Sequence, residues 1–205
     1  MTPTPKFWNW IAKRYARQPI ADEASYRRKL DVTQDYLRPD MEVLEFGCGT
    51  GSTALIHAPH VRQIQGIDFS EKMIDIARDK AQAQDVGNVS FDIATIEDWP
   101  DSRRYDAILG LSILHLLEDR DAVLRKVRGL LKPGGLFVSS TVCVGDTKGI
   151  VKWLLPIGSA LRLLPLVRVF TEGDLLRALR RAGFEVEHNW RPAPDKAVFI
   201  VAKAP

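Results

Sequence analysis

Several features that define other protein classes are scarce or missing in this sequence. Its two cysteines, Cys48 and Cys143, lie far apart, so no disulfide or zinc framework can be read, and a reducing cytoplasm is the expected location. The N-terminal segment lacks the apolar core of a secretory signal, and no uncharged apolar stretch of ~20 residues predicts a membrane span. The 29 basic and 26 acidic residues leave a formal net charge of only +3, which is too small to indicate nucleic acid binding.

The 205 residues, 45% of them hydrophobic, are enough for one domain with one sizeable core. We expect a single domain over 1–205 with four segments. These are a helical, aromatic and basic N-terminal segment (1–38), a central core (39–142), an apolar insertion (143–172) and a C-terminal helix with a hairpin (173–205).

Within the central core, short apolar runs alternate with amphipathic segments. The alternation predicts a parallel sheet joined by right-handed crossovers. The expected strands are 41–46, 61–67, 88–94, 105–111 and 136–142, and the expected helices are 7–17, 23–37, 52–58, 71–83 and 119–131. Ser70 is the expected N-cap of the helix over 71–83.

The C-terminal segment follows a different pattern. A capping-box sequence that starts at Thr171 opens a helix over 171–182, and Gly183 ends it. Two strands, 184–190 and 196–203, follow with a short proline-containing connection, which suits a hairpin. The whole chain therefore predicts an α/β fold with a seven-stranded, mostly parallel sheet, an antiparallel last strand and helices on both faces.

The most informative motif is VLEFGCGTG at 43–51, which closes the first expected strand and opens a helix. Its glycines allow a tight turn and a close approach by a ligand, and the helix N-terminus favours an anion or a carboxylate. The spacing is G-x-G-x-G, with Ser52 where a dinucleotide fingerprint would need its third glycine, which counts against a dehydrogenase. A tight turn without any ligand is the alternative.

Asp68 ends the second expected strand, 21 residues after Gly47. A carboxylate at this place can accept two hydrogen bonds from a ribose diol, so Asp68 supports a nucleoside ligand. It could equally be a helix N-terminal charge or a solvated loop acid.

Four motifs in order resemble class I S-adenosylmethionine-dependent methyltransferases: VLEFGCGTG, GIDFSEKMIDIAR, YDAILGLSILHLL and LLKPGGLFVSS. The small-molecule branch, which contains the ubiquinone and menaquinone biosynthesis methyltransferases, is the most similar. The resemblance implies a Rossmann-like fold, S-adenosyl-L-methionine as cofactor and S-adenosyl-L-homocysteine as product. It also implies a cofactor-binding core at 39–142, an N-terminal lid, and a cap or substrate-side insertion at 143–172.

The resemblance also implies roles for individual residues. The glycine loop would pass under the cofactor, Glu45 would hold the loop and the methionine ammonium, and Asp68 would bind the ribose. Tyr15 would cover the methionine end, although its helix could simply pack on the domain. The full set of implied cofactor-binding residues is Tyr15, Glu45, Gly47, Cys48, Gly49, Gly51, Asp68, Phe69, Met73, Thr95, Ile96, Leu111 and Ser112.

The adenine side departs from the family pattern. Phe69 and Met73 supply apolar walls, but Thr95 stands where the family often has an acidic residue that contacts the adenine amino group. Thr95 could accept the same bond, with the Ile96 N–H on a ring nitrogen. Asp92 and Glu97 are the neighbouring alternatives.

His115 is the candidate general base for an oxygen acceptor, because it follows the fourth expected strand. A histidine in an apolar run can instead be a packing residue or a cap. The thiol of Cys48 is interpreted as a small filler. No metal site is expected, since no spaced histidine pair or Asp/Asn/His cluster follows that strand.

The apolar stretch 150–170 is interrupted by basic residues and prolines, which argues against a membrane span. Because it leaves the carboxyl end of the expected sheet, we expect it to cap the acceptor pocket, with Trp153, Leu154, Ile157 and Leu161 as lining. It could also contact a membrane surface or form a dimer interface. The expected function is methyl transfer to a small, lipophilic acceptor, by a monomer or homodimer without a nucleic acid partner. Phospholipid N-methylation at a membrane surface and cofactor binding without turnover are the alternatives.

Overall fold

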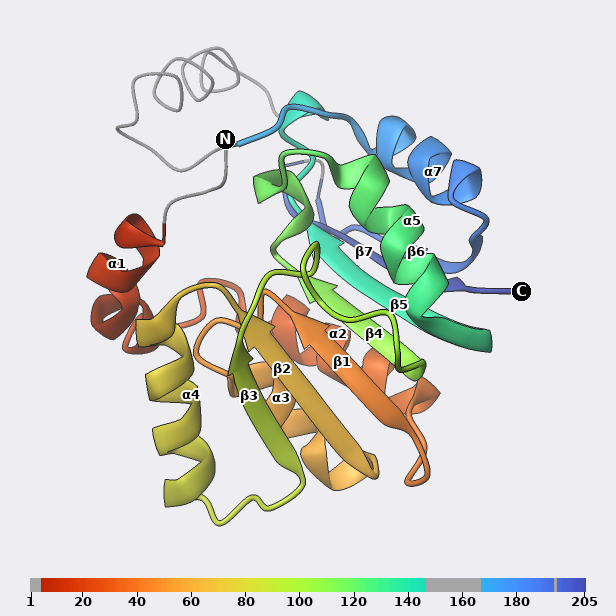
Figure 1. The fold of residues 1–205 in the computed structure, drawn as a ribbon. Coiled ribbons are helices and arrows are strands. Elements are labelled where there is room, and N and C mark those ends of the chain that lie inside the picture. The colour runs from red at the N-terminus through yellow and green to blue at the C-terminus, as the bar shows by residue number, and fades with distance from the viewer. Residues whose placement is uncertain (1–4, 147–166, 194) are drawn as a thin grey trace. The chain divides into compact units, whose positions relative to one another are not determined.

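The computed structural model describes residues 5–146, 167–193 and 195–205 (Figure 1). These residues form two compact units, one that ends at Leu109 and one that begins at Gly110. Within the described ranges, no helix is both long and apolar enough to cross a membrane.

The first unit contains four α-helices, three complete strands and most of a fourth strand, β4, whose last two residues lie beyond the boundary at Leu109. The helices are α1 (Lys6–Ala16), α2 (Glu23–Tyr36), α3 (Ser52–His57) and α4 (Glu71–Ala83), with a short 3₁₀ helix, η1 (Ala58–His60). The strands are β1 (Glu42–Phe46), β2 (Gln63–Asp68), β3 (Val89–Ile93) and β4 (Tyr105–Leu111). β1 pairs in parallel with β2 and β4, and β2 pairs in parallel with β3.

The second unit contains η2 (Leu114–Leu116), α5 (Arg120–Leu130), β5 (Leu131–Thr141), η3 (Val144–Asp146), α7 (Glu172–Arg181), β6 (Glu185–Trp190) and β7 (Val198–Lys203). β7 runs antiparallel to both β5 and β6. The sheet has seven strands in the order β3-β2-β1-β4-β5-β7-β6. The predicted seven-stranded, mostly parallel sheet with an antiparallel last strand is therefore confirmed.

Burial of consecutive residues shows that the inner strands are covered on both faces. Side chains alternate between faces along a strand, yet Ala107, Ile108 and Leu109 of β4 are all fully buried. β7 repeats this pattern from Val198 to Ala202, whereas β6 alternates between exposed and partly buried residues. This is the burial expected for a sheet with helices on both faces and β6 at an edge.

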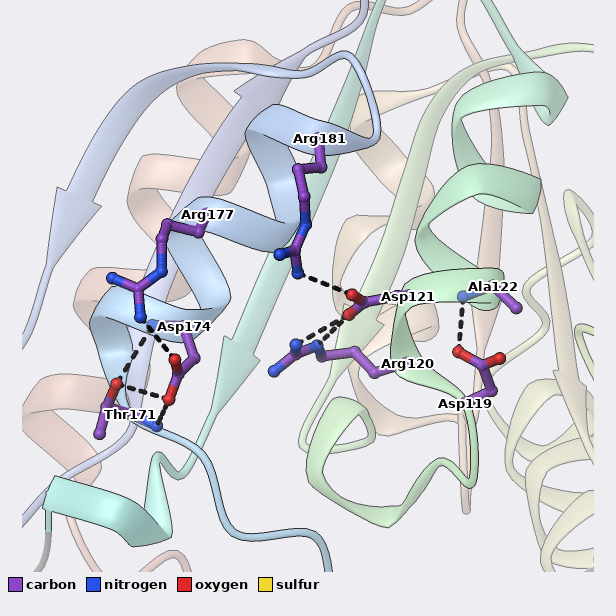
Figure 2. Close-up of polar contacts among 8 residues, drawn as sticks. All are labelled: Asp119, Arg120, Asp121, Ala122, Thr171, Asp174, Arg177 and Arg181. Atoms are coloured by element: carbon purple, nitrogen blue, oxygen red, sulfur yellow. Dashed lines mark hydrogen bonds and ion pairs between the residues drawn. The ribbon is translucent and has the colours of Figure 1, made fainter.

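The predicted helix boundaries rest on caps that the structure contains. Ser70 accepts a hydrogen bond from the Met73 N–H at 3.3 Å. Figure 2 shows the capping box of α7, in which the Thr171 and Asp174 side chains accept from each other's backbone N–H groups, at 3.1 and 2.9 Å. These pairings satisfy N–H groups that the first turn of a helix leaves without a partner.

Asp121 fastens α7 to α5 within the second unit. Its carboxylate accepts hydrogen bonds from Arg120 and from Arg181, both at 2.8 Å (Figure 2). The hydrogen bond from Arg120 is the main reason that the pKa of Asp121 is lowered. The guanidinium of Arg120 also lies 4.5 Å from the centre of the Phe170 ring, a cation–π contact.

One predicted boundary is wrong. β5 begins at Leu131, directly after α5, and not at residue 136. Hydrogen bonds between Gly134 or Gly135 and Ala204 keep this stretch extended beside the chain end, and the left-handed φ of Gly134 (75°) lets it bend. Pro133, Gly134 and Gly135, which lie between the predicted helix and the predicted strand, are thus part of an irregular strand.

Candidate cofactor site in the first unit

The glycine loop between β1 and α3 is built from three left-handed backbone positions. Gly47, Gly49 and Gly51 have φ values of 62°, 54° and 71°. The loop is held by hydrogen bonds from the Cys48 N–H to the Ile67 carbonyl and from the Gly51 N–H to the Cys48 carbonyl, both at 3.0 Å. These conformations strain any residue with a Cβ atom, so the fold itself requires the glycine pattern.

The glycines of the loop meet different surroundings. A Cβ atom at Gly51 would lie 2.6 Å from Cζ of Phe91 and 2.8 Å from Cβ of Ala77, so this backbone packs directly on neighbouring side chains. Among the described residues, a Cβ atom at Gly49 would meet only Cε1 of Tyr15, at 3.9 Å. Gly51 therefore serves packing, whereas Gly49 faces a more open side of the loop.

Cys48 is buried in the loop and packs toward β2. A Cβ atom at Gly66 would lie 3.2 Å from its sulfur. Burial raises the pKa of the Cys48 thiol well above its usual value, and the charges of Glu45 and Asp68 raise it further. A thiol in this state is a poor nucleophile, which agrees with the interpretation of its side chain as a filler.

Asp68 stands at the end of β2 and joins three backbone segments. Its Oδ2 accepts a hydrogen bond from the Gly49 N–H at 3.0 Å, and its Oδ1 accepts one from the Ser70 N–H at 2.8 Å. Burial raises the pKa of Asp68, while these two hydrogen bonds lower it. Each carboxylate oxygen has a second lone pair, so Asp68 can accept further hydrogen bonds beyond those to the backbone.

Glu45 is an acidic side chain inside the first unit. It is 3% exposed, and its Oε2 has no hydrogen-bond partner among the described residues. Burial raises the pKa of Glu45 to about 8; a hydrogen bond from the backbone of Ala54 opposes this rise and the charge of Asp68 adds to it. A buried carboxyl oxygen without a partner is costly, and a cationic ligand would relieve that cost.

Helix α1 is hydrogen-bonded to the start of α4, next to Asp68, through an asparagine that the sequence analysis did not identify. Oδ1 of Asn9 accepts hydrogen bonds from the Ser70 hydroxyl at 2.6 Å and from the Lys72 N–H at 3.2 Å. Because Ser70 also donates its N–H to Asp68, hydrogen bonds run from α1 through Ser70 and Asp68 to Gly49. No local sequence signal marks Asn9, since its partners lie more than 60 positions away.

Tyr15 lies on α1 beside Gly49, with its ring edge-on to Trp8 at a centroid distance of 6.4 Å. Partial burial raises its pKa, and so do the nearby charges of Asp68 and Glu45. The structure thus brings together four of the predicted residues, Tyr15, Glu45, Gly49 and Asp68. The role of α1 as a lid over the cofactor, as against a helix that simply packs on the domain, stays a prediction.

The residues predicted for the adenine side are less open to a ligand. Met73 and Ile96 are buried and Phe69 is partly buried. The Thr95 hydroxyl donates to Asp98 Oδ2 at 2.8 Å and accepts from the Asp98 N–H at 3.2 Å, so it closes a local turn. A second acceptor role for Thr95 would have to share that oxygen.

Asp92, the alternative to Thr95, is engaged elsewhere. It accepts a hydrogen bond from the Gln65 side chain at 3.1 Å and lies 3.8 Å from the Arg78 guanidinium. Asp92 also precedes the end of β3, whereas ligands of parallel sheets bind beyond the carboxyl ends of the strands.

Candidate catalytic residues in the second unit

Leu111 and Ser112 follow directly on the boundary between the units. Leu111 is the last residue of β4, and Ser112 has a left-handed φ of 57°, which is strained for serine. The Ser112 N–H donates to the Ser140 carbonyl at 2.6 Å. This turn ends β4 and directs the chain into η2.

His115 lies in η2 and is held by two contacts. Its Nδ1 is 3.0 Å from Oγ1 of Thr141, at the end of β5, and its backbone carbonyl accepts from the Arg168 N–H at 2.8 Å. Burial lowers the pKa of His115, which keeps the imidazole neutral and able to accept a proton. Thr141 as its partner was not predicted, because a β-branched residue in an apolar strand carries no sign of such a contact.

The four side chains predicted to line a cap, Trp153, Leu154, Ile157 and Leu161, lie outside the described residues. In the described part of the chain, no group of three His, Cys, Asp or Glu side chains is arranged to hold a metal ion.

Comparisons with known proteins identify the family. A sequence profile described as "Methyltransferase domain" matches residues 37–175, more than half of the chain. The chain belongs to the methyltransferase family. The family assignment made from the four motifs is thus confirmed.

Three relatives show how far the similarity extends. Ubiquinone biosynthesis O-methyltransferase of Coxiella burnetii is 33% identical over 112 residues, which cover 54% of this chain and 47% of that protein. The protein of the same name from Pelagibacter ubique is 25% identical over 215 residues, 96% of this chain and 85% of its own length. The solved structure of an S-adenosylmethionine-dependent methyltransferase from Mesorhizobium loti has a TM-score of 0.73 at 21% identity, covering 89% of this chain and 99% of that one.

The first of these matches is partial: the chain spans about half the length of the curated relatives that it matches at about one-third identity. The structural likeness shows that the methyltransferase fold is shared.

Proposed function

We propose that the chain catalyses S-adenosylmethionine-dependent methyl transfer to a small, lipophilic acceptor. The observation that carries the proposal is a pair of carboxyl groups next to the glycine loop: Glu45, whose Oε2 has no hydrogen-bond partner among the described residues, and Asp68, which accepts a hydrogen bond from the Gly49 N–H. Family membership supports the same activity, and the relatives named for ubiquinone biosynthesis support a lipophilic acceptor.

The two carboxyl groups suit the two polar ends of S-adenosylmethionine. Glu45 is the residue to hold the methionine ammonium, because its buried oxygen lacks a partner and its charge would be neutralised there. Asp68 is the residue to accept the ribose hydroxyls, because the backbone uses only one lone pair of each oxygen. Tyr15 would cover Gly49 and exclude water from this end.

The bound cofactor supplies an electrophilic methyl group on its sulfonium centre. The protein's part is to place the acceptor in line with that group and, for a hydroxyl acceptor, to remove its proton. We assign the removal of this proton to His115. Its pKa is lowered, so the ring is neutral at pH 7, and the contact to Thr141 uses only Nδ1, which leaves Nε2 for the acceptor.

Two measurements test this function. The first is calorimetric binding of S-adenosylhomocysteine against NAD, and we expect micromolar-range binding of the former only. The second is transfer of a labelled methyl group from S-adenosylmethionine to phenols, quinone precursors and phospholipids. We expect label in a phenol or a quinone precursor.

Three outcomes would contradict the proposal. Label only in phosphatidylethanolamine would indicate phospholipid N-methylation, the runner-up function. Tight cofactor binding with no transfer to any acceptor in the panel or in a cell extract would indicate a binding protein. Preference for NAD would remove the methyltransferase assignment itself.

A further inference from the structure

Helix α1 has two chemically different sides. The inner side carries Asn9, which is bonded to the start of α4, the fully buried Ala12, and Tyr15 beside Gly49. The outer side carries Lys6, Trp10, Lys13 and Arg14, at positions i, i+4, i+7 and i+8, which share one face of a helix. The contacts of the inner side therefore turn the outer side away from the first unit.

Trp10 is the most exposed large apolar side chain in the described part of the protein, at 78%. Cations surround it in sequence, and its ring lies 6.5 Å from that of Phe7. None of Lys6, Lys13 and Arg14 takes part in a salt bridge within residues 5–146, 167–193 and 195–205. We call Lys6, Trp10, Lys13 and Arg14 the outer face of α1.

The charge of the chain is concentrated at this end. Residues 1–21 contain four basic residues and no acidic one, a contribution of +4. Since the formal net charge of the whole chain is +3, residues 22–205 together carry −1. The net positive charge of the chain therefore comes from α1 and its flanks.

We infer that the outer face of α1 docks on an anionic lipid surface. Tryptophan favours the boundary between headgroups and acyl chains, and basic residues beside it are attracted to anionic headgroups. An exposed tryptophan flanked by unpaired cations on one helical face has the character of an interfacial helix. With 11 residues, α1 can lie on such a surface but is too short to span it.

Docking would place the cofactor site at the lipid boundary. The same helix that meets the lipid with Trp10 lies over the glycine loop with Tyr15 and is bonded through Asn9 to Ser70. A lipophilic acceptor could then pass from the bilayer to the enzyme without crossing bulk water. The inference goes beyond the proposed function and does not depend on it, because lipid binding needs neither cofactor nor turnover.

The test is co-sedimentation of the full chain with vesicles of phosphatidylcholine containing 30–40% phosphatidylglycerol (about the anionic fraction needed for a strong surface potential) and with vesicles of phosphatidylcholine alone. We expect binding to the anionic vesicles, weakened by salt, and little binding to the neutral ones. Lys13→Glu/Arg14→Glu should reduce the vesicle partition constant by about tenfold or more, and Trp10→Ala by several-fold.

A matched control separates the outer face from general electrostatics. Arg125→Glu/Arg180→Glu makes the same change in net charge at two exposed positions of α5 and α7. This control should bind anionic vesicles within about twofold of the original protein, because screening confines surface attraction to roughly a Debye length of 8–10 Å. All variants should retain their affinity for S-adenosylhomocysteine, which would show that they are folded. Loss of lipid binding would then be separate from loss of the proposed function.

Three results would overturn the inference. One is absence of binding to the anionic vesicles at low salt. Another is equal loss of binding in the control and in Lys13→Glu/Arg14→Glu. The third is self-association that sedimentation velocity shows to be abolished by Trp10→Ala without any lipid binding, which would make the outer face an interface between copies of this chain.

Discussion

The glycine loop of the first unit and the η2 region of the second unit offer chemistry in different forms. The site at the loop is built mainly from backbone groups: three left-handed glycines shape the turn, and Asp68 accepts hydrogen bonds from the backbone N–H groups of Gly49 and Ser70. Around η2, a side chain carries the proposed chemistry, because His115 depends on the Thr141 hydroxyl and on one backbone contact with Arg168.

This difference explains why the cofactor site can be predicted from the sequence more readily than the catalytic region at η2. A backbone-built site tolerates only particular residues at fixed spacing, so its motif is visible in a single sequence. A site that rests on one side chain and a partner 26 positions away leaves no pattern of comparable length. The cofactor is therefore easier to infer than the acceptor.

The largest effect is expected from His115→Gln. If the imidazole removes a hydroxyl proton, kcat should fall by about 10²–10⁴-fold, while affinity for S-adenosylhomocysteine changes by less than about twofold. Burial lowers the pKa of His115, so the neutral base persists to lower pH than an ordinary histidine would allow. The kcat of the original protein should therefore stay constant down to the usual histidine pKa and decline only at lower pH. Steady-state rates over pH 5–9 provide the measurement.

Thr141→Val and Thr141→Ser are the controls for that experiment. The valine variant keeps the shape but loses the contact to His115, whereas serine can restore it. If kcat of His115→Gln equals that of the original protein, the acceptor needs no base from this residue, and η2 is only a structural turn.

Asp68→Ala should have the next largest effect, on the cofactor half. Loss of charge-assisted bonds to the ribose should weaken S-adenosylhomocysteine binding by about 2–4 kcal/mol, or roughly 30- to 1000-fold in Kd. The structure adds a second consequence: the Gly49 and Ser70 N–H groups lose their acceptor, so the free energy of unfolding should fall by about 1–3 kcal/mol.

Asp68→Asn distinguishes these two contributions. The amide oxygen can still accept one backbone hydrogen bond, so this variant should recover part of the stability without recovering full affinity. Unchanged Kd in a folded Asp68→Ala variant would contradict the ribose assignment.

Alanine substitutions in the loop separate its packing role from its binding role. Gly51→Ala should destabilise the protein by about 3 kcal/mol or more, because the new Cβ atom would lie 2.6 Å from the Phe91 ring and φ is left-handed. Gly49→Ala should cost about 1–2 kcal/mol from backbone strain alone. Denaturant unfolding measures both, and equal losses would mean that the two glycines do not differ as described.

Most of the secondary structure could be predicted because its signals are local. The caps at Ser70 and Thr171 fix helix starts through bonds within three residues, and the expected strand over 105–111 is observed with those bounds. The early start of β5 was not predicted, because the stretch before residue 136 is held extended by hydrogen bonds between Gly134 or Gly135 and Ala204, at the other end of the chain. A local sequence signal cannot report such a contact.

The same reasoning explains the gaps in the site. Asn9 acts on Ser70 and Lys72 across the fold, so its role becomes visible only in three dimensions. Thr95 was assigned by alignment with a family pattern, but the geometry of its turn with Asp98 decides what its oxygen can do. Residue type identified the candidates, and long-range packing decided their partners.

The last expected effect needs no substitution: it is a pH dependence of cofactor binding that originates at Glu45. Burial raises its pKa to about 8, so the free protein holds this side chain protonated at pH 6–7. Because this folded pKa lies above the ordinary value of 4.5, the group makes the free protein less stable as pH rises from 4.5 to 8.

An ammonium beside Glu45 would reverse that balance. The positive charge favours the carboxylate, so binding must release a proton, and affinity for S-adenosylhomocysteine should rise about tenfold per pH unit between pH 6 and 7. Calorimetry in buffers of different ionisation enthalpy should detect about one proton released at pH 6.5. Glu45→Gln should bind with little pH dependence and release no proton, since its amide does not titrate. If the original protein also releases none, the ammonium does not contact Glu45, and the buried carboxyl group belongs to the loop alone.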